Sequence, residues 1–312
     1  MSRSSIAARS PLGLLALSVL ALGAARSPES EKHTLQSGGR ERSYRLYVPT
    51  RIATGAPAAL VLVFHGGRGD GAGMERLTGF DAIADRDGFL VAYPDGVGRQ
   101  WNDGRDVAEF QTTRDRVDDV AFVSELIDEI ARRHPVDSKR VFATGISNGA
   151  IFSHYLGARL ASRIAAIAPI AGGIAEPYRP RFRPERPVSV LMMNGSDDPL
   201  VPYRGGPVGG THGRVLGADE SAALWAAADQ CSKDPKTDTL PDSDPKDGCR
   251  VKRELWPGGR EGTEVQLYRF DGGGHTWPGG PQYLPKLVIG AVCRDVDATP
   301  VIWAFFRAHP RA

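Results

Sequence analysis

Short apolar runs alternate along this chain with segments whose apolar residues recur at helical spacing. Continuous runs predict buried strands at residues 59–64, 89–94, 140–144, 165–171 and 188–193, and strict alternation predicts half-buried strands at residues 44–48 and 265–270. The helical spacing predicts helices at residues 77–86, 118–133, 150–160, 218–229 and 295–309. We therefore expect an α/β fold, in which a mostly parallel central sheet carries helices on both faces.

The first 25 residues have the composition of a secretory signal peptide. Arg3 and Arg9 form a basic start, residues 12–24 are an apolar stretch short for a membrane span, and Gly23 and Ala25 suit cleavage after Ala25. A buried N-terminal helix is the alternative, but polar, proline-containing sequence follows at once. We expect residues 1–25 to be a signal peptide, residues 26–312 to form a single domain with a frayed start over 26–43, and the protein to be secreted or periplasmic.

The charge balance limits the class of partner. The chain has 39 Lys and Arg residues against 37 Asp and Glu residues, so its formal charge is +2. Loss of residues 1–25 would remove Arg3 and Arg9 and no acidic residue, which leaves a formal charge of zero. A neutral mature chain gives no electrostatic reason to expect nucleic acid or an anionic membrane as partner. It suits an uncharged substrate, and we expect no membrane anchor in the mature form.

A Gly-x-Ser-x-Gly pentapeptide is the most informative motif. Gly145-Ile146-Ser147-Asn148-Gly149 stands between a predicted strand and a predicted helix. A serine on such a sharp strand-to-helix turn is held with its hydroxyl exposed, as a nucleophile elbow. Glycine is needed at both ends because a side chain would collide with the neighbouring strand and helix.

An acid and a histidine follow Ser147 at the ends of later predicted strands. A weak serine nucleophile needs a histidine to accept its proton and an acid to orient that histidine. The strand at 188–193 leads to Asp197 and Asp198, and the strand at 265–270 leads through three glycines to His275. This is the order Ser, Asp, His that the α/β-hydrolase fold uses. Taken singly, Asp198 could be an ordinary turn residue and His275 could be one of seven scattered histidines. The order of the three residues taken together predicts a catalytic triad.

Other loops supply candidates for the rest of the site. The backbone N–H groups of Asn148 and Gly67 are the expected oxyanion hole, and His65 is expected to be structural. The aromatic residues expected to line a substrate site are Trp277, Trp101 and Tyr203, although ordinary packing explains each nearly as well. Residues 205–264 are expected to be an elaborated segment that could cap the site.

Three cysteines bear on the export hypothesis. Cys231 and Cys249 flank a polar stretch, and we expect a disulfide between them, since a loop of this size is worth on the order of 3 kcal/mol in an oxidising compartment. Cys293 is then expected to be a small buried residue. No Cys or His spacing is typical of a zinc site, so neither a metal nor another cofactor is expected.

The chain resembles the polyhydroxybutyrate depolymerase-like esterases of the α/β-hydrolase superfamily, which are similar to feruloyl and acetylxylan esterases. The matching stretches span about residues 40 to 309 and are His65-Gly66-Gly67, Tyr93-Pro94-Asp95-Gly96, Asp118-Asp119-Val120, Gly145–Ala150, Asp198–Tyr203 and Gly273–Gly279. The resemblance implies Ser147 as nucleophile, Asp198 rather than Asp197 as the acid, and His275 as the base. Arg68 and Asp70 depart from the small residues of the family's loop.

These observations predict an exported serine carboxylester hydrolase that cleaves short-acyl, hydroxybutyrate-oligomer or aryl esters. No polymer-binding module or linker is recognisable in the sequence, which favours soluble oligomers and small esters over crystalline polymer. A feruloyl or acetylxylan esterase acting on plant cell-wall esters is the alternative. A peptidase on the same fold would lack an obvious charged specificity residue, and a non-catalytic binding protein would not need an intact triad.

Overall fold

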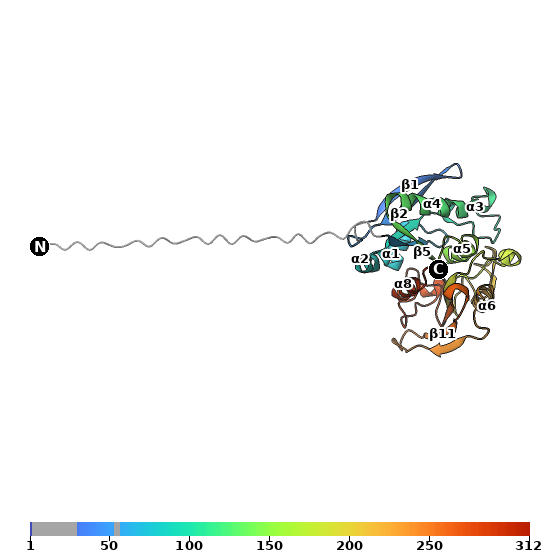
Figure 1. Cartoon of the computed structure of the whole chain (residues 1–312). Helices are drawn as coiled ribbons and strands as arrows, with labels where there is room; N and C mark the ends of the chain where they lie inside the picture. Colours follow the sequence, from blue (N-terminus) through green and yellow to red (C-terminus); the bar gives the residue numbers. More distant parts are fainter. Residues whose placement is uncertain (2–29, 53–56) are drawn as a thin grey trace.

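The computed structural model describes residues 30–52 and 57–312, together with Met1. Ten strands form one sheet in the order β1-β2-β4-β3-β5-β6-β7-β12-β11-β10, drawn across the molecule in Figure 1. They are β1 (Glu31–Ser37), β2 (Arg40–Tyr47), β3 (Ala58–Phe64), β4 (Leu90–Pro94), β5 (Val136–Ile146), β6 (Ala166–Ile170), β7 (Ser189–Gly195), β10 (Lys236–Thr239), β11 (Arg250–Trp256) and β12 (Val265–Asp271). The strands from β4 to β12 in this order run parallel, and antiparallel pairs close both edges. The predicted mostly parallel sheet is confirmed.

Helices cover both faces of this sheet. One core contains residues of α4 (Asp119–Arg133), α5 (Asn148–Arg159) and α6 (Ala218–Asp229). The other contains residues of α1 (Gly71–Thr78), α2 (Phe80–Asp87) and α8 (Ala298–Ala308). Strand β3 alternates between the two cores along its whole length, which is why its sequence is apolar at every position.

Shorter elements lie in the connections between these layers. They are the helices α3 (Gln111–Arg114) and α7 (Lys286–Ile289), the 3₁₀ turns η1 (Val97–Arg99), η2 (Glu176–Arg181) and η3 (Arg260–Gly262), and a separate two-stranded pair, β8 (Gly205–Pro207) and β9 (Arg214–Leu216). Among the described residues, no helix is both long and apolar enough to cross a membrane. Residues 2–25 of the expected signal peptide lie outside the described part of the chain.

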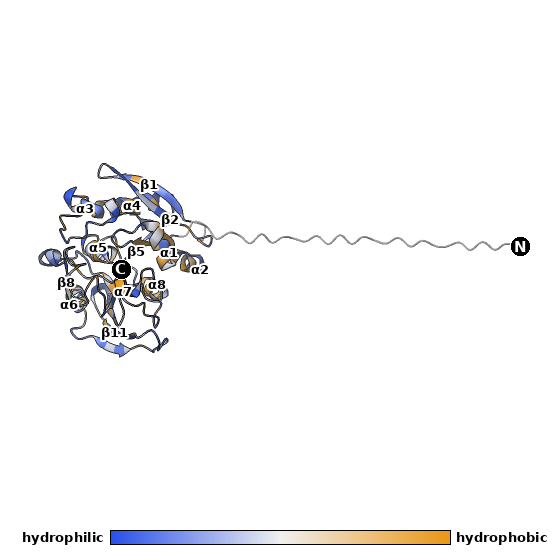
Figure 2. Cartoon of the chain, turned by 180° about the vertical axis from the view of Figure 1, so that it is seen from behind, coloured by the Kyte–Doolittle hydropathy of each residue, from blue (hydrophilic) through white to orange (hydrophobic). Residues whose placement is uncertain are grey.

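The structure differs from the predicted elements mainly at the edges of the sheet. Residues 31–37 form β1 and not a frayed start, and β10 and β11 extend the other edge. Figure 2 shows β1 and β11 mostly in the blue of hydrophilic residues. An edge strand that pairs through its backbone and buries little has no apolar pattern to reveal it. The helix predicted at 77–86 is two helices, because Gly79 adopts a left-handed φ of 62° between α1 and α2.

The predicted disulfide between Cys231 and Cys249 is wrong. Cys249 pairs with Cys293, and Cys231 is free. The reason is that Cys231 packs against the core on one face of the sheet, whereas Cys249 and Cys293 are both buried in the core on the other face. The bridge joins residues 44 positions apart, and a loop of that length corresponds to about 4 kcal/mol of stabilisation in the chain-entropy picture.

A buried ion pair ties the first edge of the sheet to α4. Arg42 on β2 donates to Asp119 at 2.7 Å, and the two side chains are only 3% and 0% exposed. The second carboxylate oxygen of Asp119 accepts the Asn102 N–H at 2.8 Å, and the Arg42 guanidinium stacks over Phe122 at 3.8 Å. Asp118, the other half of the Asp-Asp motif, accepts from the Ala121 N–H and so caps α4.

Removal of one partner of this pair should therefore be costly. We expect Arg42→Met to lower the free energy of unfolding by about 3 kcal/mol or more, because it leaves the Asp119 carboxylate buried without its cation. The matched control is Arg40→Met, whose ion pair with Asp115 is solvent-exposed and should contribute less than about 1 kcal/mol. Urea unfolding of the three proteins measures both differences; equal, small losses would show that the buried pair does not hold β2 on α4.

Candidate active site

Ser147 sits in a strained turn between β5 and α5. Its backbone angles are φ 60° and ψ −121°, a left-handed conformation that a side chain rarely adopts. The two flanking glycines are required by their surroundings: a Cβ on Gly145 would lie 2.6 Å from the carbonyl oxygen of Phe64, and one on Gly149 only 2.3 Å from it. The elbow geometry predicted from the pentapeptide is therefore present, and for the predicted reason.

His275 and Asp198 are brought together from different strand ends. The His275 Nδ1 atom lies 2.7 Å from Asp198 Oδ2, with both side chains buried. The other carboxylate oxygen accepts the N–H groups of Leu200 and Val201, each at 2.8 Å, which fixes the orientation of the carboxylate. Since Nδ1 donates to the carboxylate, Nε2 carries the lone pair and can act as a base.

The competing acid, Asp197, does not meet the histidine. Its side chain is exposed and accepts from the neighbouring Ser196 hydroxyl at 2.7 Å. Both residues lie in the turn after β7, and only the Asp198 carboxylate bonds to His275. The geometry therefore selects Asp198, the residue favoured by the resemblance.

The two expected oxyanion donors flank Ser147. Asn148 is the first residue of α5, so its N–H has no acceptor within the helix. Gly67 lies in the loop between β3 and α1, and its N–H donates to no other described residue. This loop is closed by bonds from Gly69 N to Gly66 O and from Arg68 N to Arg99 O, both 2.9 Å.

His65 is structural, as expected. Its Nε2 accepts the Gly96 N–H at 2.9 Å, and its Nδ1 lies 2.7 Å from the Gly66 carbonyl oxygen. A neutral ring protonated at Nδ1 makes both hydrogen bonds. Burial lowers the pKa of His65, which keeps the ring neutral. Burial also lowers the pKa of His154, on the helix behind Ser147, to about 3.

The Asn148 side chain locks the elbow to the loop after β4. Its Oδ1 accepts the Trp101 N–H at 2.8 Å, and its Nδ2 donates to Asp103 Oδ2 at 2.6 Å. Asp103 is in turn paired with Arg105 at 2.7 Å, with both side chains buried. The sequence predicts a role only for the backbone N–H of Asn148. The polar residues at 101–105 indicate a hydrogen-bonding loop, but they do not reveal that the Asn148 side chain is its partner.

Two cavities meet at Ser147 and Gly67. The first, of about 500 Å³, is also lined by His275, by the apolar residues Met74, Leu77, Ile146, Leu200, Leu284 and Ile289, and by the charged residues Asp70, Arg76 and Arg99. The second, of about 630 Å³, is also lined by Asn148 and by the more polar set of Gln100, Arg105, Glu109, Phe110, Gln111 and His212. Volumes of this size suit small ligands.

The predicted aromatic wall is wrong, because Trp101, Tyr203 and Trp277 line neither cavity. Trp101 is fully buried between Phe64 and Phe152 and donates to the His65 carbonyl oxygen at 2.9 Å. Trp277 is buried and donates to the Thr299 hydroxyl at 2.9 Å, and the Tyr203 hydroxyl donates to Asp219 at 2.5 Å. The residues are near the site in sequence, but their rings turn into the core.

A group of exposed apolar residues, of which Tyr283 and Leu284 line the first cavity, was not predicted from the sequence. Tyr283, Leu284, Leu287 and Val288 are the large exposed hydrophobic residues of the described chain apart from Met1, and Leu287 is 96% exposed. They follow the His275 loop and include part of α7. Of the segment 205–264, only Val208, Gly209 and His212 line a cavity at Ser147; α6, β10 and β11 belong to the layers and edge of the sheet.

Comparison with known proteins finds esterases among the relatives of this chain. Residues 42–177 match the sequence profile described as esterase PHB depolymerase. The chain is 30% identical over 273 residues to the putative esterase NocK of Nocardia uniformis subsp. tsuyamanensis, covering 83% of this chain and 77% of that protein. It is 32% identical over 233 residues to feruloyl esterase B of Piromyces equi, covering 72% of this chain but only 40% of that longer protein.

A solved structure supports the fold. The acetyl xylan esterase from Aspergillus awamori superposes with a TM-score of 0.57 over 79% of this chain and 94% of that chain, at 16% identity. At that identity the likeness shows the α/β-hydrolase fold alone, whereas the sequence matches show descent. The chain belongs to the polyhydroxybutyrate depolymerase family of esterases, carboxylic ester hydrolases with the α/β-hydrolase fold.

Proposed function

We propose that this protein is an exported serine carboxylester hydrolase that works through an acyl-enzyme on Ser147. The observation that carries the proposal is the 2.7 Å pairing of His275 with Asp198 at the cavity that also holds the strained Ser147. Export is supported by the Cys249–Cys293 disulfide, because such bridges persist in oxidising compartments, together with the signal peptide expected from residues 1–25.

The chemistry follows from the placement of these groups. His275 Nε2 takes the Ser147 proton as the hydroxyl oxygen attacks the ester carbonyl, and Asp198 stabilises the imidazolium that forms. The N–H groups of Gly67 and Asn148 bind the developing oxyanion. His275 then protonates the departing alcohol, and a water molecule activated by the same histidine releases the acid from Ser147.

The two cavities divide the substrate between them. The alcohol oxygen must receive its proton from His275, so the alcohol part belongs in the first cavity, which His275 lines. The acyl part then enters the second cavity, which is lined by both oxyanion residues, Gly67 and Asn148, but not by His275. These volumes fit short-acyl esters, aryl esters and soluble hydroxybutyrate oligomers. A feruloyl or acetylxylan ester is the second candidate, favoured by the similarity to feruloyl esterase B.

Ser147→Ala should abolish ester hydrolysis and leave the fold intact. We expect a loss of about 10³-fold or more in kcat, because the other members of a triad do nothing without the nucleophile. Hydrolysis of p-nitrophenyl acetate and labelling by a fluorophosphonate probe measure the loss. The control is Ser232→Ala, which changes an exposed serine outside both cavities and should match the unmodified protein. Retention of more than about a tenth of the activity would remove Ser147 from the mechanism.

The two neighbouring acids provide a matched pair of variants. Asp198→Asn should lower kcat by about 10³-fold or more, because an amide holds the imidazole in the wrong tautomer. Asp197→Asn should change kcat little, since Asp197 is exposed and bonds only to Ser196. The reverse ranking of kcat would transfer the role to Asp197.

A substrate panel separates the candidate functions. We expect the purified protein to hydrolyse short-chain p-nitrophenyl esters and soluble hydroxybutyrate oligomers. Measurement of kcat/KM for methyl ferulate, acetylated xylan oligomers and peptides under the same conditions provides the comparison. A dominant kcat/KM for the ferulate or the acetylated xylan oligomers would move the assignment to cell-wall esters. Cleavage of peptides alone would contradict the esterase assignment.

A further inference from the structure

The loop that carries His275 is held in part by a segment later in the chain. The His275 N–H donates to the Ile289 carbonyl oxygen at 2.5 Å, and the Gly274 N–H donates to that of Ala291 at 2.9 Å. The two backbones touch, because a Cβ on Gly274 would lie 2.2 Å from the Ile289 oxygen. The position of the imidazole therefore depends on where residues 289–293 lie.

Residues 289–293 are in turn fixed to β11 through the disulfide. Cys293 is bridged to Cys249, directly before β11, and Cys293 also accepts the Gly279 N–H on its carbonyl oxygen at 2.9 Å. In the register of the β11–β12 pair, Arg250, next to Cys249, lies opposite Asp271, the last residue of β12 before the His275 loop. The His275 loop thus leaves the sheet beside one cysteine and is supported by the segment that ends at the other.

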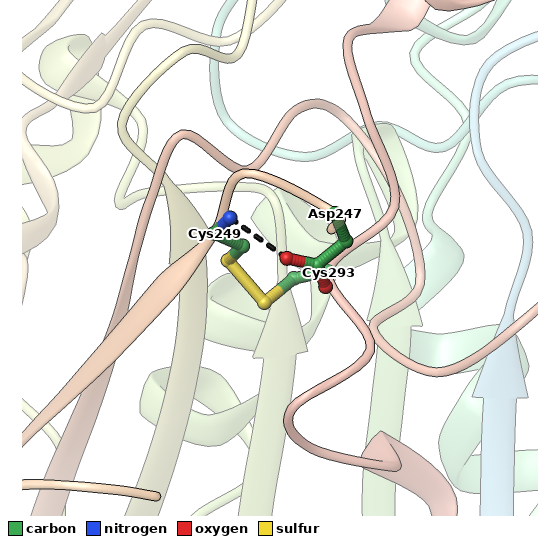
Figure 3. A group of neighbouring side chains, drawn as sticks. All are labelled: Asp247, Cys249 and Cys293. Atoms are coloured by element: carbon green, nitrogen blue, oxygen red, sulfur yellow. Dashed lines mark hydrogen bonds between the residues drawn. A yellow bond between two sulfur atoms is a disulfide. The ribbon is translucent and has the colours of Figure 1, made fainter. Parts of the chain in front are cut away.

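Asp247 closes the same connection without a covalent bond. One carboxylate oxygen accepts the Cys249 N–H and the other accepts the Arg294 N–H, both at 2.7 Å. Figure 3 shows the carboxylate beside the bridge, with the bond to the Cys249 nitrogen dashed. A single carboxylate therefore joins the backbone on both sides of the disulfide.

We propose that the Cys249–Cys293 disulfide and Asp247 are a positioning device for His275, so that opening the bridge lowers turnover more than substrate binding. This rests on the proposed function, in which His275 is the base. Displacement of a catalytic group by about 1 Å can cost about 10²-fold in rate. The walls of the acyl cavity come from other segments, including residues 98–114, and of residues 289–293 only Ile289 lines the alcohol cavity, so ground-state binding should depend less on the bridge.

The device responds to reduction. Dithiothreitol supplies two electrons and two protons, converts the bridge to two thiols and is itself oxidised to its cyclic disulfide. Cys231 is the free cysteine of the chain, so a Cys231→Ala background removes the third thiol and prevents exchange among partners. Non-reducing peptide mapping of the unmodified protein should first find Cys249 joined to Cys293; a bridge to Cys231 would overturn the proposal at once.

The test compares Cys249→Ala/Cys293→Ala with the matched control Cys231→Ala, at a temperature where circular dichroism shows both folded. We expect kcat for p-nitrophenyl acetate to fall about tenfold or more in the double variant, with KM within about threefold. Asp247→Asn, which keeps the bridge but turns an NH₂ group toward one backbone N–H, should give a smaller fall in kcat. In a His275→Ala background the same cysteine changes should have no further effect on the residual rate.

Each possible result of this test either supports or contradicts the positioning role of the disulfide. A lower melting temperature with unchanged kcat would make the bridge merely structural, and a rise in KM alone would assign it to binding; either overturns the proposal. If the double variant does not fold, reduction of the Cys231→Ala protein replaces it, and kcat must fall and return on reoxidation while the circular dichroism spectrum stays constant. Absence of ester hydrolysis and fluorophosphonate labelling in the Cys231→Ala control would instead count against the proposed function.

Discussion

The close approach of the end of β3 to the start of α5 is the constraint on which the site depends. The Phe64 carbonyl oxygen occupies the space that a Cβ of Gly145 or Gly149 would need. Because the two glycines let strand and helix meet, the residue between them is driven into a left-handed conformation with its hydroxyl at the surface of two cavities. The same approach places the loop that follows β3, and with it Gly67, beside Ser147.

The base is positioned by a different kind of interaction. Ser147 is placed by its own neighbours in sequence and by one adjacent strand, with its N–H bonded to the Ile170 carbonyl oxygen at 3.0 Å. His275 follows a run of three glycines that cannot hold a shape alone. Its place is set by the Asp198 carboxylate, by the Tyr283 hydroxyl on its carbonyl oxygen, and by the backbone of residues 289–291. The nucleophile is thus a local feature and the base a tertiary one.

This difference explains what the sequence could predict. Apolar runs reveal buried strands, and strand ends in a parallel sheet share one edge, so the order Ser147, Asp198, His275 could be placed without a structure. The side chains of Trp277, Trp101 and Tyr203 could not, because a ring beside a catalytic residue turns into the core or the cavity according to packing. The pairing of Cys249 also depends on which face of the sheet each cysteine occupies. The chain passes from one face to the other between Cys231 and Cys249, and the polar sequence between them gives no indication of this change. The polar edge strands β1 and β10 carry no apolar period at all.

The two ways of positioning give the two halves of the catalytic machinery different sensitivities. The elbow is held by backbone packing in the middle of the sheet, where any opening must break the contacts between β3, β5 and α5. The His275 loop lies between β12 and a segment whose neighbours, Leu284, Leu287 and Val288, are exposed and contribute little burial. Local opening is cheapest where few apolar contacts are lost. The His275 loop is therefore positioned by hydrogen bonds to residues 196–198 and 289–291, and the Cys249–Cys293 bridge adds a covalent anchor to the second of these segments.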